Sequence, residues 1–325
     1  MNISRISIYE EKLERKVFMI FDAHCDALLK LHYHSKDHSF QSAGDLHITY
    51  PQLTSAHSKV QLFAIYLPSE LKPGVRFQTA LEMIEVFHRK VLEPNPKMKM
   101  VTSKADIEAL KPDEIGAMLT LEGAEAIEED LTKLETLYRL GVRSVGLTWN
   151  WANAVADGAL EPRAAGLTKF GKNVVSYLNE KRMWTDVSHL CEASFWDTMA
   201  IADFPIASHS NVHDICPHPR NLKKDQIQQL IKQDGVMGIT FVPYFLNSAG
   251  TADINDVLRH LDYICGVGGE HHVGFGSDFD GISETVEGLS SYKEYNNLVN
   301  SLQNYYSESQ VHQFLYKNFT DKIPF

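Results

Sequence analysis

The sequence predicts an α/β protein built as a (β/α)₈ barrel, a TIM-type barrel that forms a single domain over residues 1–325. Short apolar runs rich in β-branched residues recur along the chain, and amphipathic segments with helical spacing lie between several of them. No Gly/Ser-rich linker divides the chain, and no GxGxxG motif favours a dinucleotide-binding sheet. Eight strand–helix units in one uninterrupted chain are more typical of a closed barrel than of an open sheet.

The expected strands are the eight runs Val17–Phe21, Val60–Tyr66, Gly116–Leu121, Ser144–Thr148, Met183–Val187, Pro205–Ala207, Val236–Phe241 and His272–Gly276. Between them lie helical stripes that stop at glycines, such as the stripe from Leu131 to Tyr138, which ends before Gly141. Alternating strands and helices pair the strands in parallel, so the carboxyl ends of all strands should meet on one face.

Composition and charge narrow the class of protein. A formal net charge of -11 argues against a nucleic-acid partner, because phosphate binding needs clustered Lys and Arg. The stretch Met1–Lys16 has no apolar core of a secretory signal, and no apolar run is long enough to cross a bilayer, so we expect no membrane partner. The four cysteines are scattered without CxxC spacing, which predicts a cytoplasmic protein with no disulfide.

Metal-competent side chains follow the expected strands at the end where barrel enzymes carry their catalytic groups. His24 and Asp26 follow the first run, and two residues apart on an extended segment they share a face. The other candidates lie at or just after the third, fifth, sixth and eighth runs and are Glu122, His189, His209 and Asp278. Each alone is a weak signal, but their common position predicts a metal centre on one face of the barrel.

Other polar residues near these motifs have a structural interpretation. Asp280 precedes a glycine and forms either part of the site or a turn. Asp22 and Asp186 are expected to orient their neighbours rather than bind metal. Cys25 and Cys216 are expected to be small buried thiols.

The candidate ligands suit a particular chemistry. Neutral imidazole and carboxylate are the usual ligands of zinc and related ions. Two ions ~3.5–4 Å apart can share a bridging carboxylate and a bridging hydroxide, and metal binding brings the pKa of water to ~7. We therefore expect two Zn²⁺ ions, with other divalent ions able to occupy the same ligands, and hydrolysis of an amide by the bridging hydroxide.

Taken in register, the motifs resemble those of the membrane (renal) dipeptidase family of zinc metallopeptidases, peptidase family M19. The resemblance runs from Phe21 to about Gly281 and rests on the stretches His24-Cys25-Asp26, Leu121-Glu122-Gly123, Asp186-Val187-Ser188-His189, Ser208-His209-Ser210, Arg220-Asn221 and Gly276-Ser277-Asp278-Phe279-Asp280-Gly281. The chain looks like a soluble bacterial member, since it lacks the secretory signal of the membrane-anchored animal proteins.

The resemblance implies a division of metal ligands. His24 and Asp26 would hold the first zinc, His189 and His209 the second, and Glu122 would bridge the two.

It also implies substrate contacts. Asp278 would meet the free amino group and handle the proton, so that Asp278 and Glu122 are the expected catalytic residues. Arg220 would pair with the C-terminal carboxylate, which a guanidinium fork binds in bidentate fashion.

One position departs from the family pattern. Trp149 stands where many members carry a histidine that assists the tetrahedral intermediate, and an indole cannot titrate. Either Asn150, Asn153 or the metals alone then stabilise the oxyanion, or the substrate preference differs. Trp149 and Tyr244 are candidate substrate-binding residues, with a place in the core as the alternative.

The sequence thus predicts a metal-dependent dipeptidase that cleaves dipeptides with free amino and carboxyl ends and tolerates a D-residue on the C-terminal side. A related amidohydrolase acting on N-acyl amino acids or cyclic amides is the first alternative, and a non-catalytic metal-binding barrel is the second. Arg220 disfavours the first alternative and Asp278 the second. A homodimer is compatible with the sequence.

Overall fold

The structure, a computed structural model, describes residues 17–33, 39–42 and 44–325, so the stretch Met1–Lys16 lies outside the described residues. The described strands are β1 Ile20–Asp22, β2 Ser58–Tyr66, β3 Met98–Met100, β4 Ile115–Glu122, β5 Val142–Gly146, β6 Trp184–Asp186, β7 Pro205–Ala207, β8 Val236–Ile239 and β9 Val273–Phe275. The α-helices are α1 Ala27–Tyr33, α2 Tyr50–Ser55, α3 Arg76–Val86, α4 Lys104–Glu108, α5 Leu131–Arg139, α6 Lys169–Glu180, α7 Glu192–Met199, α8 Lys224–Lys232, α9 Pro243–Leu246, α10 Ile254–Gly266, α11 Tyr295–Tyr305, α12 Glu308–His312 and α13 Asn318–Asp321. Short 3-10 or π segments lie at Phe87–Leu92, Ala124–Ala126, Tyr292–Glu294 and Gln313–Lys317.

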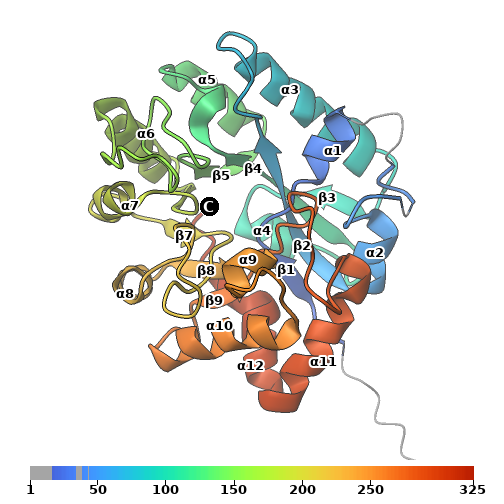
Figure 1. The fold of residues 1–325 in the computed structure, drawn as a ribbon. Coiled ribbons are helices and arrows are strands. Elements are labelled where there is room, and N and C mark those ends of the chain that lie inside the picture. The colour runs from blue at the N-terminus through green and yellow to red at the C-terminus, as the bar shows by residue number, and fades with distance from the viewer. Residues whose placement is uncertain (1–16, 34–38, 43) are drawn as a thin grey trace, which may run out of the picture.

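The strands form a closed parallel barrel ringed by helices (Figure 1). Their order is β2-β1-β9-β8-β7-β6-β5-β4, and β2 pairs with β4 along nearly its whole length, which closes the ring. Each of the eight runs expected from the sequence contributes one of these strands. The predicted (β/α)₈ barrel is therefore confirmed.

Two strand predictions differ from the structure. β3 is a strand that the sequence did not reveal, because Met98–Met100 is only three residues long and carries a lysine in the middle. It pairs with the start of β4, below the point where β5 joins the same edge. β1 begins at Ile20 rather than at Val17, which is 60% exposed and has no strand partner.

Helix ends follow the local signals in the chain. Asp253 caps α10 by accepting from the backbone N–H groups of Asn255 and Asp256, and Asp130 caps α5 through Thr132. The apolar stripe of α10 packs inward through residues such as Leu261 and Ile264, as its spacing predicts. These helices hold the strands of the barrel from outside.

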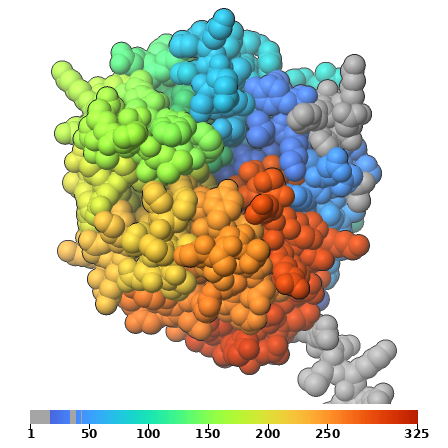
Figure 2. Space-filling view, in the orientation of Figure 1, coloured from blue at the N-terminus to red at the C-terminus, as the bar shows by residue number. Residues whose placement is uncertain are grey.

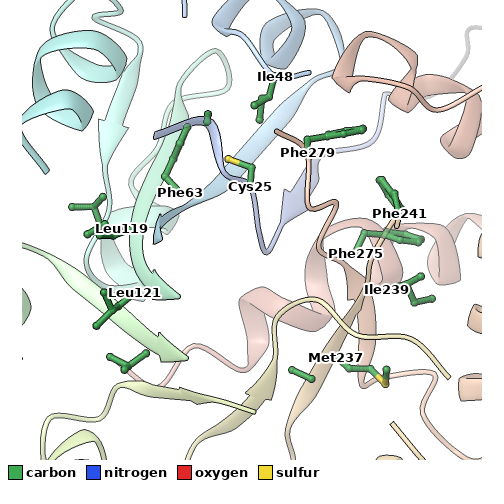
Figure 3. Packing of buried hydrophobic residues seen from close by; sticks show 14 of the residues in the cluster. Cys25, Ile48, Phe63, Leu119, Leu121, Met237, Ile239, Phe241, Phe275 and Phe279 are labelled. Carbon is green, nitrogen blue, oxygen red and sulfur yellow. The ribbon is translucent and has the colours of Figure 1, made fainter. Parts of the chain in front are cut away.

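Apolar side chains form an outer layer between the barrel and its helices, and part of that layer is shown in Figure 3. Cys25 lies in it between Phe63 and Phe279 (Figure 3). Cys25 is fully buried, as is expected for a small thiol used in packing. All four cysteines are free in the structure.

A second apolar cluster fills the barrel interior. Phe21 stacks on Phe319 with ring centroids 5.2 Å apart, and Trp184 lies edge-on to Phe325. The Trp184 indole also donates to the carbonyl of Lys322 at 3.0 Å. The C-terminal segment therefore closes the floor of the barrel, and only the opposite end is left for a site.

The segments that follow the strands meet over the mouth of the barrel, where surfaces from widely separated parts of the chain converge (Figure 2). Helix α9 and the loop after β9 lie in front in this view (Figure 1). Among the described residues, no helix combines the length and the apolar character that crossing a membrane requires.

Candidate metal centre

The barrel brings the predicted metal-competent residues together. His24 and Asp26 follow β1, Glu122 is the last residue of β4, and the remaining three candidates follow β6, β7 and β9, namely His189, His209 and Asp278. All except Asp278 are at most 8% exposed, and the side chain of Asp278 is 15% exposed. The rule that catalytic groups lie at the carboxyl ends of barrel strands correctly located this cluster.

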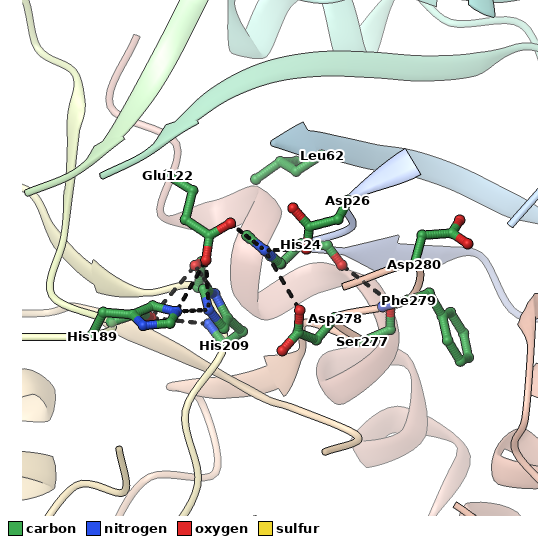
Figure 4. Close-up of polar contacts among 12 residues, drawn as sticks. His24, Asp26, Leu62, Glu122, His189, His209, Ser277, Asp278, Phe279 and Asp280 are labelled. Carbon is green, nitrogen blue, oxygen red and sulfur yellow. Dashed lines mark hydrogen bonds and ion pairs between the residues drawn. The ribbon is translucent and has the colours of Figure 1, made fainter. Parts of the chain in front are cut away.

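Glu122 lies between two groups of side chains (Figure 4). Its Oε2 is 3.4 Å from His24 Nε2, which is also 3.3 Å from Asp26 Oδ2 and 3.9 Å from Asp278 Oδ1. Its Oε1 is 3.0 Å from His189 Nε2 and 3.6 Å from His209 Nε2. One carboxylate thus faces an acidic group on one side and a pair of imidazoles on the other.

The imidazole pair has the donor arrangement of a metal site. The Nε2 atoms of His189 and His209 face each other at 2.8 Å. The Nδ1 atom of His189 contacts the Asn150 side-chain oxygen, and that of His209 contacts the Ser208 hydroxyl, each at 2.8 Å. Since the amide oxygen only accepts and the Ser208 hydroxyl donates to Asp186, both protons belong on Nδ1 and both Nε2 lone pairs point at one place. A cation bound between the two Nε2 atoms would remove the repulsion between their lone pairs.

Two atoms on the other side of Glu122 have no hydrogen-bond partner. They are His24 Nε2 and Asp26 Oδ1, and both are buried. Among the described residues, ligand atoms come within 4.8 Å of one another in two trios, His24–Glu122–His209 and His24–Asp26–Asp278. Buried atoms of this kind are satisfied by a divalent ion, and imidazole with carboxylate is the set that zinc prefers.

Burial and charge set the protonation states that the site favours. Burial and the nearby Arg220 cation lower the pKa of His189 to about 3, and burial together with His24 lowers the pKa of His209 well below its usual range. Both rings are therefore neutral, which is the form that binds metal. Burial and the charge of Glu122 raise the pKa of Asp26, since carboxylates packed together repel.

Two buried carboxylates hold the motifs in place, as the sequence indicated. Asp22 Oδ1 accepts from the backbone N–H groups of His24 at 3.3 Å and Ser277 at 2.9 Å, which joins β1 to the loop after β9. Asp186 Oδ1 accepts from the N–H groups of Ser188 and Ser208, each at 3.0 Å, and joins the loops after β6 and β7.

Asp280 proves to be a loop anchor. Its carboxylate accepts from Lys30 Nζ at 3.0 Å and from the backbone N–H groups of His47 at 2.8 Å and Ile48 at 3.3 Å. Figure 4 shows it turned away from Glu122, on the far side of Asp278. Of the two interpretations of Asp280, the structural one is confirmed.

The backbone is unusual where the site is closest-packed. His189 and Asp278 have φ angles of 69° and 64°, in the left-handed region that side chains other than glycine rarely adopt. A Cβ at Gly281 would lie 2.2 Å from Asp26 Oδ2 and 2.6 Å from Asp278 Oδ1. Glycine at this position lets the loop after β9 turn back onto its own Asp278 and lie against Asp26.

A cavity of about 170 Å³ opens beside the cluster. Asp26, Glu122 and Asp278 line it together with the aromatic side chains of Tyr66, Trp149 and Tyr244. Trp149 is half-buried and meets Tyr66 edge to face, with ring centroids 5.3 Å apart, while Tyr244 is 47% exposed. Both aromatic candidates from the sequence thus face the cavity.

Sequence reasoning missed Tyr66, although it ends β2 at the same face as the ligands. A tyrosine at a strand end is not a metal-competent group, so the ligand pattern does not include it. Of the two asparagines considered for this region, Asn150 lines the cavity. Asn153 instead bonds within its own loop, since its amide nitrogen donates to Glu125 Oε1 at 3.1 Å and to the Leu147 carbonyl at 2.8 Å.

Arg220 lies beside the imidazole pair. It is 3% exposed, and its Nη2 donates to the His209 carbonyl at 3.1 Å, whereas Nε has no hydrogen-bond partner. Burial lowers the pKa of Arg220 to about 10, so the group stays cationic. It borders a neighbouring cavity of about 200 Å³, which shares His189 with the first. A buried cation with an unused N–H is suited to a carboxylate ligand.

Buried polar contacts fix the loop that carries Arg220. The Asn221 amide donates to the carbonyls of Cys216 and Phe245, each at 2.8 Å, and joins the loop to α9. His260 on α10 accepts from the Val212 N–H at 2.9 Å and contacts the Leu246 carbonyl through Nε2 at 3.0 Å. Hydrogen bonds therefore link the loop that contains Arg220 to α9, which contains Tyr244.

His260→Gln should make unfolding less sensitive to acid. Burial, and to a smaller extent Arg259, lower the pKa of His260 to about 4, whereas an unfolded histidine titrates near ~6.5. As the pH falls from about 6.5 to 4, the unfolded chain takes up a proton that the folded chain does not, so stability falls by about 3 kcal/mol. Gln offers an accepting oxygen and a donating NH₂ group but does not titrate.

Urea unfolding of both proteins from pH 8 to pH 4 measures this effect. The free-energy difference between them should change across that window in favour of the variant. A difference that stays constant with pH would contradict the assignment. Contributions from the other titrating groups cancel, because both proteins share them.

The comparisons with known proteins agree with this geometry. The family model for membrane dipeptidases, peptidase family M19, matches residues 10–321. A crystal structure of a metallopeptidase from Rhodobacter sphaeroides with a phosphinate mimic of the dipeptide L-Ala-D-Ala superposes with a TM-score of 0.89, at 26% identity, over 95% of this chain and 99% of that one.

Two curated relatives are similar in sequence. An uncharacterised protein from the pqqA 5′ region of Klebsiella pneumoniae is 33% identical over 260 residues, which are 76% of this chain and 96% of the relative. The dipeptidase aclJ of Aspergillus oryzae is 31% identical over 271 residues, which are 78% of this chain and 64% of that protein. With the closed barrel, the ligand cluster at its mouth and a family match over nearly its whole length, the chain belongs to the membrane dipeptidase family of metallopeptidases, family M19.

Proposed function

We propose that this protein is a dipeptidase with a binuclear metal centre, acting on dipeptides whose amino and carboxyl ends are both free. The observation that carries the proposal is the position of Glu122, whose two oxygens face two separate groups of ligands. A single carboxylate placed in this way suits two ions better than one.

In this proposal His24 and Asp26 would hold one ion, His189 and His209 would hold the other, and Glu122 would be available to both. Zinc is the metal that the ligand set favours, and manganese or cobalt also suits it. When bound, such ions polarise a carbonyl group and lower the pKa of water, so that a nucleophile is present at neutral pH.

Asp278 and Arg220 position the two ends of the dipeptide. Asp278 faces the cavity beside Asp26 and attracts the free ammonium group. It also accepts a proton from the attacking water and returns it to the leaving nitrogen as the amide C–N bond breaks. Arg220 binds the terminal carboxylate with its unused N–H. Trp149 and Tyr244 form the apolar wall between these ends.

The C-terminal residue of the substrate is proposed to be accepted in the D-configuration as well as the L-configuration. The relative from Rhodobacter sphaeroides, bound to a mimic of L-Ala-D-Ala, supports this extension. Dipeptides of the kind found in bacterial cell walls fall within this class.

Hydrolysis of a dipeptide panel tests the proposal. Protein loaded with zinc should cleave L-Ala-L-Ala and L-Ala-D-Ala, lose activity when a chelator removes the metal, and recover it on adding zinc. N-acetylated and C-amidated forms of the same dipeptides are the matched controls, and we expect them to be poor substrates. Turnover of N-acetyl-alanine derivatives without turnover of free dipeptides would replace the proposal with an acylase activity.

A further inference from the structure

Both ring nitrogens of His189 contact other side chains, and the two sets of contacts come from different parts of the barrel. Its Nε2 faces Glu122 and His209 across the proposed metal site. Its Nδ1 lies 2.8 Å from the side-chain oxygen of Asn150, in the loop after β5. Because an amide oxygen can only accept, this contact requires the ring proton on Nδ1 and leaves Nε2 free as a ligand atom.

The same loop holds the backbone of His189. The His189 carbonyl accepts from the Ala159 N–H at 2.6 Å and from the Thr148 hydroxyl at 3.3 Å. The Asn150 carbonyl in turn accepts from the Leu160 N–H at 2.9 Å, which fixes the residue that carries the amide. These contacts stabilise the backbone of His189, whose φ of 69° is unfavourable for a residue other than glycine.

The partner of His209 is of another kind. Its Nδ1 contacts the Ser208 hydroxyl, which donates to the buried carboxylate of Asp186 at the strand ends. That relay is buried throughout, whereas Asn150 is only half-buried and lines the cavity next to Trp149. The two imidazoles are therefore oriented independently. Ser208 and Asp186 at the strand ends orient His209, and Asn150 in the wall of the cavity orients His189.

We propose that Asn150 is the positioning residue for His189, holding the imidazole in the tautomer and orientation that bind a divalent ion. This inference rests on the metal centre of the proposed function, but not on its substrate. The acceptor at Nδ1 keeps Nε2 directed at Glu122 and increases the ring's strength as a ligand. Loss of that acceptor lets the ring turn or take up the other tautomer, so that a proton occupies the position of the metal.

Metal titration of the whole protein tests the proposal without any need for turnover. Zinc binding is measured by competition with a chromophoric chelator in the wild type, Asn150→Ala and Asn150→Asp. Asn150→Ala should weaken one of the two ions by about 10- to 100-fold. Asn150→Asp, which keeps an acceptor of the same shape, should restore tight binding. Trp151→Ala, an exposed neighbour in the same loop, is the matched control and should bind both ions as the wild type does.

The absorption spectrum of the cobalt-loaded protein gives a second readout, because it reports ligand geometry directly. Asn150→Ala should change the spectrum of one site, and Asn150→Asp should resemble the wild type. Wild-type zinc affinity in Asn150→Ala overturns the proposal. Equal weakening in Asn150→Asp and Asn150→Ala also overturns it, because packing rather than the acceptor would then hold the ring. A protein that binds two ions but cleaves no dipeptide would refute the proposed function alone.

Discussion

Replacing Asp278 with Asn should lower kcat/KM for a dipeptide by about 10²- to 10⁴-fold, the range over which general acid–base groups act. Asp278 faces the cavity next to Asp26, and its backbone N–H is tied to the His24 carbonyl at 3.2 Å, so the variant should keep its geometry. An amide of the same shape cannot accept the proton of the attacking water. Steady-state kinetics with L-Ala-L-Ala, together with metal analysis of the purified variant, measure the effect.

Asp280→Asn is the matched control, two residues along the same loop. Its carboxylate anchors Lys30 and the segment around His47, so we expect a loss of stability of about 1–3 kcal/mol with kcat/KM close to wild type. Asp278→Asn should show the reverse, with normal stability and little activity. If Asp278→Asn loses a metal ion, Asp278 acts as a ligand, as the second ligand trio would allow, and its assignment to proton transfer is wrong.

Arg220→Met should lower kcat/KM by about 10²- to 10³-fold for a dipeptide with a free carboxylate, mainly through KM. Loss of one partner from a buried, hydrogen-bonded charge pair costs about 2–5 kcal/mol, and Met fills most of the volume of the lost side chain. The same dipeptide with a C-terminal amide should be cleaved equally slowly by both proteins, because it has no carboxylate for Arg220 to bind. Comparing the free and amidated dipeptides distinguishes two roles of Arg220, binding the substrate carboxylate and maintaining the structure of the site.

Lys97→Met controls for the general loss of a positive charge. Lys97 is exposed and pairs with Asp113 at 2.8 Å, before the starts of β3 and β4 and so at the end of the barrel opposite the ligand cluster. Its kinetics should match the wild type for both substrates. If Arg220→Met reduced the cleavage of the free and amidated dipeptides by the same factor, Arg220 would act through its hydrogen bond to the His209 carbonyl instead.

The sequence located the candidate ligands because their position follows from topology. In a parallel barrel the residues that directly follow the strands lie on one face, regardless of the conformation of the loops beyond them. Glu122 and the three histidines needed no more than this. Tyr66 obeys the same rule and was missed because an aromatic residue at a strand end has no chemical signature of its own.

Other features depend on contacts between distant segments, which no local pattern records. Asp280 is an anchor because the loop carrying His47 passes beside it, and nothing near Asp280 in the sequence indicates this. Asn150 and Asn153 are the same residue type in the same loop. Asn150 nevertheless contacts His189, whereas Asn153 bonds to the backbone of its own loop. β3 forms because β4 is long enough to offer a free edge below β5.

The closure of the barrel bears on how the chain can fold during synthesis. Asp22 accepts from the Ser277 N–H, a contact that spans 255 residues, and Phe21 stacks on Phe319, which comes later still. At ~5–20 residues per second, the ribosome would take roughly 13–50 s to cover that distance. During that time β1 has β2 beside it but no β9, and the barrel has no floor. The nascent chain therefore exposes strand edges and the apolar interior until almost all of it has emerged, and the closed barrel can form only at the end of synthesis.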